Sequence, residues 1–408
     1  MKISSIMLVC LMIGAINWTS LNDLQEEKGL SFYVLLRFII LSITIIYISL
    51  NFNIFIGLIS DSSFFRLVTL FMSMRILQSF TAPEMLLSLF KSIEFLAYTV
   101  TFTIICFKRR SNISALLALL LQSYIIAVSI AVMSAILFPD VGLRMLGSLP
   151  QIQGVFPSWN SNGLAQVCSL LVLVSIYVKK ELPSIYRISV ISFLVTVVFF
   201  CQTRSVLLPF VLLIFMYFWR QTKDYRIKFL YIFLLVLSLI LALVSVSELW
   251  DYVSRGQNTE TMLNFSGRLI SWAYTYDYLI ENPSVLLHGL GSYTGYKEIL
   301  GPETFILLEQ TIAEHTLDNT YLELIVNSGL VGFTIFVYLI YKLHIILKSI
   351  TDKRERIIIQ SILYLILIRS FFVSSLLIQS NLIFIFLLSY GVILNLTRYG
   401  AVHKKCAV

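Results

Sequence analysis

Long apolar runs recur along the whole chain, and they constrain its fold more than any other feature. A helix needs about 20 apolar residues to cross a hydrocarbon core of about 30 Å. Because 58% of the residues are hydrophobic and 13% are charged, a soluble fold would expose large apolar patches. We predict an all-α polytopic membrane protein, one integral membrane domain over residues 1–408 with about 12 transmembrane helices. The runs occupy residues 3–19, 32–50, 64–80, 84–106, 113–137, 163–178, 187–203, 205–219, 228–247, 320–343, 357–377 and 381–397.

Basic residues cluster in alternate connections between these runs, although the net charge of +8 alone would also suit a nucleic-acid partner. Membrane proteins concentrate Lys and Arg in their cytoplasmic loops. We therefore predict a bilayer and not a nucleic acid as partner, and a bacterial inner-membrane protein with both termini cytoplasmic. The basic connections are Lys108–Arg110, Lys179–Lys180, Arg220–Lys228, Lys348–Arg356 and Arg398–Lys405.

One connection on the opposite side, residues 248–319, is far longer than a turn between neighbouring helices requires. It is acidic overall and contains Pro283, Pro302 and several glycines. We predict a folded extracytoplasmic subdomain here. Its stretch Leu269–Ile280 has apolar residues at helical spacing, which predicts an amphipathic helix along the membrane surface.

Five ionisable residues fall inside the predicted spans, where they are costly and are candidates for function. Lys91 and Glu94 lie three residues apart and can pair on one helix face. Arg37 and Arg369 can snorkel or bond to backbone carbonyls. Arg75 is the candidate for lining a polar cavity.

Arginines on the predicted outer side can hold a lipid diphosphate, because the guanidinium fork matches phosphate oxygens and stays charged. For any one of them, a surface ion pair with Asp or Glu is the alternative. The basic residues of the outer connections are Lys28, Arg144, Arg204, Arg255, Arg268 and Lys297.

The long connection ends in Glu314–Glu323, which runs directly into a predicted span. Asp318 can cap that helix. Alternatively His315, Asp318 or Glu323 takes a proton from an acceptor hydroxyl, as a general base does. The sequence has no metal-ligand cluster, phosphate-binding loop or dinucleotide motif, so we predict neither a metal nor a cofactor.

The second half also carries motifs that together resemble the O-antigen ligase and polymerase superfamily of membrane glycosyltransferases. The last of them, Asp318-Asn319 followed by Gly329 and Gly332, resembles the ligase pattern His-Asn-x9-Gly-x-x-Gly, with Asp in place of the leading His. The preceding motifs are Gly154–Ala165, Thr203-Arg204-Ser205, Ser266-Gly267-Arg268 with Trp272, Asn282-Pro283 and Gly289-Leu290-Gly291.

This resemblance implies a metal-independent, cofactor-free polymerase that joins undecaprenyl-diphosphate-linked oligosaccharide repeat units outside the membrane. It also allows a chain-length regulator as partner. The implied catalytic residues are Asp318, His315 and Arg268, and the implied diphosphate ligands are Arg204, Arg268 and Arg144. Asn319, Tyr321, Gly329 and Gly332 support the motif.

Two alternatives stay open. An O-antigen ligase would transfer the glycan to lipid A-core, but the family's His is Asp318 here, and His315 lies one turn earlier. A glycolipid flippase would also use many spans with intramembrane cations. Transporters usually have short loops and two similar halves, however, whereas this chain has one dominant loop.

Overall fold

The computed structural model describes residues 3–16, 32–110, 112–146, 149–178, 181–222, 268–299, 317–373, 376–377 and 381–406, and it is mostly helical. The elements up to residue 152 are α1 (Ile3–Ala15), α3 (Phe32–Leu50), α4 (Phe52–Asp61), α5 (Ser63–Gln78), the 3₁₀ helix η1 (Ser79–Thr81), α6 (Met85–Lys108), α7 (Ile113–Leu137), α8 (Pro139–Gly142) and the antiparallel strands β1 (Leu143–Leu146) and β2 (Leu149–Ile152). The later helices are α9 (Ser161–Tyr177), α10 (Ser184–Phe200), α11 (Arg204–Gln221), α15 (Arg268–Glu281), α16 (Pro283–His288), α17 (Tyr296–Ile299), α19 (Thr320–Lys348), α20 (Lys353–Arg369) and α21 (Leu382–Cys406).

Each predicted apolar run with described residues overlaps a helix, although the run 357–377 is helical only as far as Arg369, and the run 228–247 lies outside the described residues. Short polar side chains mark several helix starts, because they accept hydrogen bonds from backbone N–H groups that have no partner within the helix. The residues that cap helices in this way are Ser62, Asn112, Asn160, Asn319 and Asp352.

Three helices of the described residues, α6, α7 and α19, are long and apolar enough to cross a membrane. The pair Val34–Leu50 and Phe52–Asp61 passes the same test together, bent by 73°. Other apolar helices are shorter, such as Ser161–Tyr177 and Leu382–Thr397. The predicted total of about 12 spans therefore stays a prediction.

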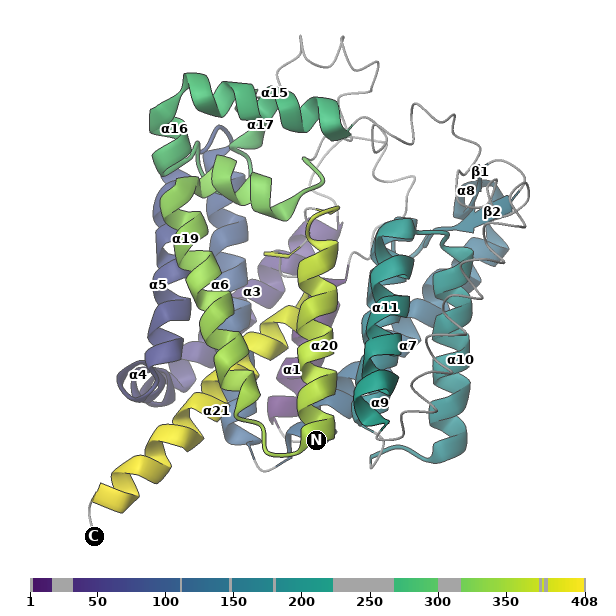
Figure 1. Ribbon diagram of the computed structural model, residues 1–408, viewed down its shortest axis with the longest axis horizontal. Coiled ribbons are helices and arrows are strands. Elements are labelled where there is room, and N and C mark those ends of the chain that lie inside the picture. Colours follow the sequence, from purple (N-terminus) through teal and green to yellow (C-terminus); the bar gives the residue numbers. More distant parts are fainter. Residues whose placement is uncertain are drawn as a thin grey trace.

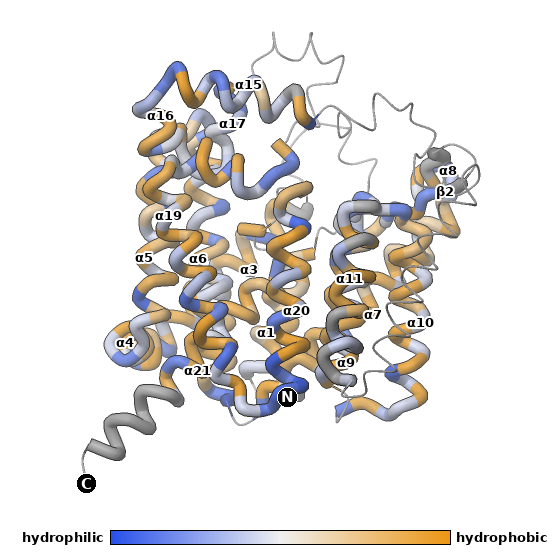
Figure 2. Tube along the Cα trace, viewed as in Figure 1, coloured by the Kyte–Doolittle hydropathy of each residue, from blue (hydrophilic) through white to orange (hydrophobic). Residues whose placement is uncertain are grey.

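The helices stand side by side in one bundle, and α15, α16 and α17 lie across one end, called here the α15 end (Figure 1). Hydrophobic residues run along the helices, and hydrophilic stretches are more frequent near the two ends (Figure 2). Many large apolar side chains face outward, as contact with lipid requires. Ile46, Leu70, Leu77, Ile126 and Ile136 are examples.

Residues 268–299, called here the cap segment, form three helices within the predicted long connection. The expected helix over Leu269–Ile280 is present as α15. A small apolar cluster, centred on Leu279, Ile299, Leu317 and Val326, joins these helices to α19. The full subdomain over 248–319 stays a prediction, because residues 248–267 and 300–316 lie outside the described part.

Helix α19 is broken at Gly329, whose φ of 64° and ψ of −176° are not helical. A break interrupts the helical hydrogen-bond ladder and leaves carbonyls of the preceding turn for other donors. The Leu290 N–H bonds to the Val326 carbonyl at 2.8 Å, and the Gly291 N–H bonds to the Asn327 carbonyl at 3.1 Å. A Cβ at Gly329 would meet the Leu287 carbonyl oxygen at 2.2 Å. The cap segment is therefore bonded to α19 through its backbone.

We expect Gly329→Ala to lower the free energy of unfolding by about 2 kcal/mol, because alanine is strained at positive φ and clashes here. Gly57→Ala is the matched control, since nothing lies within 4 Å of its added Cβ in α4. Thermal unfolding of the detergent-solubilised chain measures both variants. Equal unfolding temperatures for the two variants would contradict the assigned role of the break.

Candidate functional site

An ion pair between Arg268 and Asp318 lies at the α15 end. Arg268 is the first residue of α15, and Asp318 directly precedes the cap of α19. The Arg268 Nε and Nη2 atoms both lie 2.9 Å from Asp318 Oδ2. The two side chains are 24% and 33% exposed, so solvent and ligands can reach them. The fold thus joins two of the predicted site residues across 50 positions of sequence.

Asn319 caps α19, so the prediction that Asp318 caps this helix is wrong. Asn319 Oδ1 accepts hydrogen bonds from the backbone N–H groups of Tyr321 and Leu322, at 3.0 and 3.1 Å. Asp318 instead has a φ of +45°. Asp, Asn and His are the non-glycine residues most enriched at positive φ. The backbone therefore suits either Asp or the His of the ligase pattern at this position.

Contacts from two directions hold the segment around Asp318. From α15, Trp272 Nε1 donates a hydrogen bond to the Leu317 carbonyl at 2.7 Å. From the end of α20, the Ser370 carbonyl accepts from the Thr320 N–H at 2.8 Å. The Tyr321 hydroxyl also donates to the Leu367 carbonyl at 2.8 Å. These bonds fix the carboxylate of Asp318 relative to α15 and α20.

The glycines of the resembling motifs act as contact points between the cap segment and the bundle. A Cβ at Gly289 would meet the backbone of Asn327 and Ser328 at 2.5 Å, and one at Gly291 would meet Ala82 at 2.4 Å. Gly332 lies against Ser328 and Met74. Gly289 and Gly291 thus allow close approach of the cap-segment backbone to α19 and to Ala82, whereas Gly332 makes room for side chains of α19 and α5.

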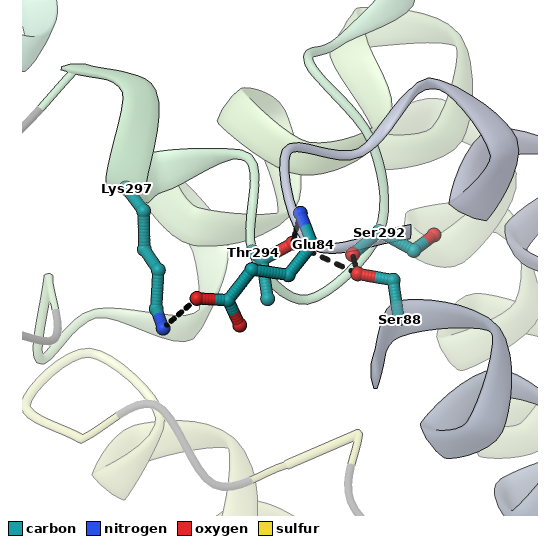
Figure 3. A network of polar contacts seen from close by, with 5 residues as sticks. All are labelled: Glu84, Ser88, Ser292, Thr294 and Lys297. Carbon is teal, nitrogen blue, oxygen red and sulfur yellow. Dashed lines mark hydrogen bonds and ion pairs between the residues drawn. The ribbon is translucent and has the colours of Figure 1, made fainter. Parts of the chain in front are cut away.

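Polar contacts join the cap segment to the start of α6 (Figure 3). Lys297 Nζ lies 2.7 Å from Glu84 Oε1, and Ser88 donates to the Ser292 carbonyl at 2.5 Å. The Oγ1 atom of Thr294 lies 2.8 Å from Ser88 Oγ. Ser88, Ser292 and Thr294 were not predicted as site residues; the one signal available was Ser88, a polar residue within the predicted span 84–106. Lys297 pairs with a carboxylate, which was the alternative considered for each outer basic residue.

Strand β1 and the start of α11, which carry Arg144 and Arg204, lie toward the α15 end of the bundle (Figure 1). Arg144 is in β1, and Arg204 begins α11. The hairpin is tied to the turn before α11, because Gln151 Nε2 donates to the Cys201 carbonyl at 2.7 Å. Gln202 Nε2 donates in return to the Pro150 carbonyl at 3.2 Å. The side chains of both arginines and all of His315 lie outside the described residues, so their roles stay predictions.

Arg369 bonds the end of α20 to the first resembling motif. It ends α20, is 2% exposed, and donates from Nη2 to the Asn162 carbonyl at 3.0 Å. Asn160, in the same motif, caps α9 by accepting from the Gly163 N–H at 2.7 Å. The expectation that Arg369 bonds to a backbone carbonyl is confirmed.

The intramembrane charges pair differently from the prediction. Glu94 is fully buried and pairs with Arg37 of α3, with Nε to Oε1 at 3.0 Å and a second contact between Nη2 and Oε2. The predicted partnership of Glu94 with Lys91 is wrong, because the forked guanidinium satisfies both carboxylate oxygens. Arg75 lines a cavity, as the sequence predicted. Within the described part, no group of three His, Cys, Asp or Glu residues could hold a metal.

We expect the Arg268–Asp318 pair to add about 1 kcal/mol or less to stability, because partly exposed ion pairs are screened by solvent. A double-mutant cycle with Arg268→Ala and Asp318→Asn, read by thermal unfolding, measures the coupling. The Lys297–Glu84 pair, tested as Lys297→Ala and Glu84→Gln, is the matched reference. A coupling of several kcal/mol would mean that the pair stabilises the fold. A loss of activity in either variant would then follow from unfolding and would not show a catalytic role.

Comparisons with known proteins agree with the motifs of the second half. A family model described as O-antigen ligase matches residues 188–337, from within α10 to within α19. Searches of curated proteins and of solved structures found no match. The matched range includes Arg268, Asp318 and the motif glycines, whereas Gly154–Ala165 precedes it. Residues 188–337 therefore carry the O-antigen ligase match, and the predicted resemblance of this chain to the O-antigen ligase and polymerase superfamily is confirmed.

Proposed function

We propose that this protein is a polysaccharide polymerase that joins undecaprenyl-diphosphate-linked oligosaccharide repeat units. The observation that carries the proposal is the Arg268–Asp318 pair at the start of α19, inside the family match. It places a cation suited to a diphosphate beside a carboxylate suited to an acceptor hydroxyl.

In the proposed reaction, the oxygen of an acceptor sugar hydroxyl bonds to the anomeric carbon of the donor. The bond from that carbon to the diphosphate oxygen breaks, and the lipid diphosphate leaves with the electron pair. Asp318 takes the hydroxyl proton. Arg268 donates hydrogen bonds to the departing diphosphate, each charge-assisted bond worth ~1.5–3 kcal/mol. Arg204 and Arg144 are proposed as further diphosphate ligands, and His315 as an alternative base.

The pairing of Arg268 with Asp318 suits this exchange of partners. A diphosphate carries more negative charge than one carboxylate, so it competes for the guanidinium. When Arg268 turns to the diphosphate, the carboxylate of Asp318 is released from the ion pair and can accept a hydrogen bond from the acceptor hydroxyl. Donor binding would thus prepare the base.

We infer that the reaction takes place on the extracytoplasmic face of the inner membrane. The basic turns Lys108–Arg110 and Lys348–Arg356 lie at the end of the bundle opposite α15, and the start of α1 and the end of α21 lie there too (Figure 1). By the positive-inside rule, that end is cytoplasmic. The ion pair then faces the outside. Association with a chain-length regulator remains part of the proposal.

An O-antigen ligase is the second candidate, because the family match does not distinguish the two activities. The acceptor differs: a ligase transfers the glycan to lipid A-core, and a polymerase to another repeat unit. We favour the polymerase because Asp318 stands where the ligase pattern has His.

We expect a strain without this protein to lose the surface-glycolipid ladder and to keep a single repeat unit on its lipid core. Wild type restores the ladder and Arg268→Ala does not, because the departing diphosphate lacks a partner. A silver-stained gel measures the ladder. Arg66→Ala, an exposed site on α5, is the matched control and restores it.

Each other pattern on that gel argues against polymerisation. Loss of every repeat unit from the core, with undecaprenyl-linked chains accumulating, would indicate a ligase or an export protein. An unchanged ladder would remove O-antigen assembly altogether.

We expect Asp318→Asn to slow repeat-unit transfer by ~10²–10⁴-fold, because Asn cannot take a proton. Asn tolerates the positive φ at this position, so the variant keeps the backbone. Asp318→His restores a proton acceptor and should retain more activity than Asp318→Asn. Transfer in membrane vesicles, with lipid-linked repeat units as substrate, measures the rates. Equal rates for wild type and Asp318→Asn would remove Asp318 as the base.

A further inference from the structure

Arg75 is a buried cation with unused hydrogen-bond donors. It lies in the last turn of α5 and is 3% exposed. Its Nε and Nη1 atoms have no hydrogen-bond partner among the described residues. A buried charge without hydrogen bonds is costly. The position therefore requires an acceptor that is not part of the described protein.

Tyr293 of the cap segment covers one face of this guanidinium. The Arg75 Cζ atom lies 4.1 Å from the centre of the Tyr293 ring, and Lys91 Nζ lies 5.8 Å from the same centre. The hydroxyl of Tyr293 donates to the Leu377 carbonyl at 2.7 Å. Burial raises the pKa of Tyr293 to about 12, so the ring brings no negative charge. Arg75 and Lys91 thus both lie near the same neutral ring. Because the ring covers a face of the Arg75 guanidinium, the N–H groups at its edge remain available to a ligand.

A cavity of about 20 Å³ borders Arg75, Tyr293 and α19. Thr320, Glu323, Leu324 and Asn327 form its α19 wall, at the spacing that puts residues on one helix face. Leu376 and Leu377 complete it. This volume takes one water-sized group, so a single oxygen atom of a ligand can enter while the remainder stays outside.

The charges around the cavity favour an anion. Glu94 neutralises Arg37, and Glu84 neutralises Lys297. Glu323 contributes one negative charge at the cavity wall, against the positive charges of Arg75 and Lys91. One positive charge is therefore in excess among these described groups. Among the described residues Asn327 Oδ1 also has no hydrogen-bond partner, so it can accept a hydrogen bond from a hydroxyl of the ligand.

We propose that the Arg75 cavity is an oxyanion subsite, in which Arg75 binds a non-bridging oxygen of the substrate's diphosphate and Lys91 adds positive charge. The subsite deepens the proposed function and rests on it. Thr320, at the cavity wall, lies two residues beyond Asp318, and Asn327 lies about 10 Å farther along α19 at 1.5 Å per residue. The first half of the chain, outside the family match, thereby contributes to the site.

The test is diphosphate binding by the purified full-length chain in detergent, measured by isothermal titration calorimetry with inorganic diphosphate as the probe. We expect Arg75→Leu to weaken the Kd at least ~10-fold, because an Arg–phosphate contact is charge-assisted. Arg75→Lys should lose less, since it keeps the charge without the fork. Arg66→Leu, on the same helix and exposed, is the matched control and should bind like wild type.

A structural role for Arg75 predicts a different result. Leu at this site removes an unpaired buried charge, so the subsite proposal expects an unchanged or higher unfolding temperature without ligand. A lower unfolding temperature together with unchanged diphosphate affinity would overturn the subsite. A sugar carboxylate is the other group that can supply an oxyanion, and glucuronate is the probe for it. Tighter binding of glucuronate than of diphosphate would overturn the assignment to a diphosphate.

Failure of the subsite and failure of the proposed function give different results. If Arg268→Ala weakens diphosphate binding and abolishes the ladder while Arg75→Leu changes neither, the subsite is wrong and the proposed function stands. If diphosphate binding depends on Arg75 but the ladder does not depend on the protein, the subsite stands as an oxyanion site and polymerisation is wrong. Absence of diphosphate binding by wild type would also overturn the subsite.

Discussion

The backbone contact between the cap segment and α19 is the interaction on which the candidate site depends. It exists because Gly329 leaves the helical conformation and frees the carbonyls of Val326 and Asn327 for Leu290 and Gly291. This contact carries α15 to the start of α19, where the ion pair forms. It also carries the loop after Gly291 onto α5. The Arg268–Asp318 pair and the Arg75 cavity therefore both depend on the break in α19 at Gly329.

Features set by local chain chemistry were predictable. The apolar runs gave the helices, and the amphipathic spacing over Leu269–Ile280 gave α15. Arg268 and Asp318 were predicted as site residues, but their contact was not, because nothing local connects positions so distant in sequence. The choice of helix cap was wrong by one residue. Asp318 and Asn319 have nearly equal capping preference, and only the positive φ at Asp318 decides between them.

Partners that come from other elements were not predictable. The rule for residues three apart on one helix suggested Lys91 for Glu94, whereas packing of α3 on α6 supplied Arg37. In the same way, the sequence indicated that Arg75 was unusual but could not name Tyr293. Each of these partners depends on how helices pack, and that is set by the whole apolar core. Burial then selects the partner that satisfies the most hydrogen bonds.

The break in α19 has a mechanical consequence. Residues 330–348 rise about 28 Å at 1.5 Å per residue, which alone nearly crosses a hydrocarbon core of about 30 Å. The part before Gly329 is tied to the cap segment by backbone bonds and to the rest of the helix by a single glycine. Because that part also bonds to the end of α20, the positions of Asp318 and of the Arg75 cavity wall are set by the cap segment and α20 together, and not by the long part of α19 that follows the break.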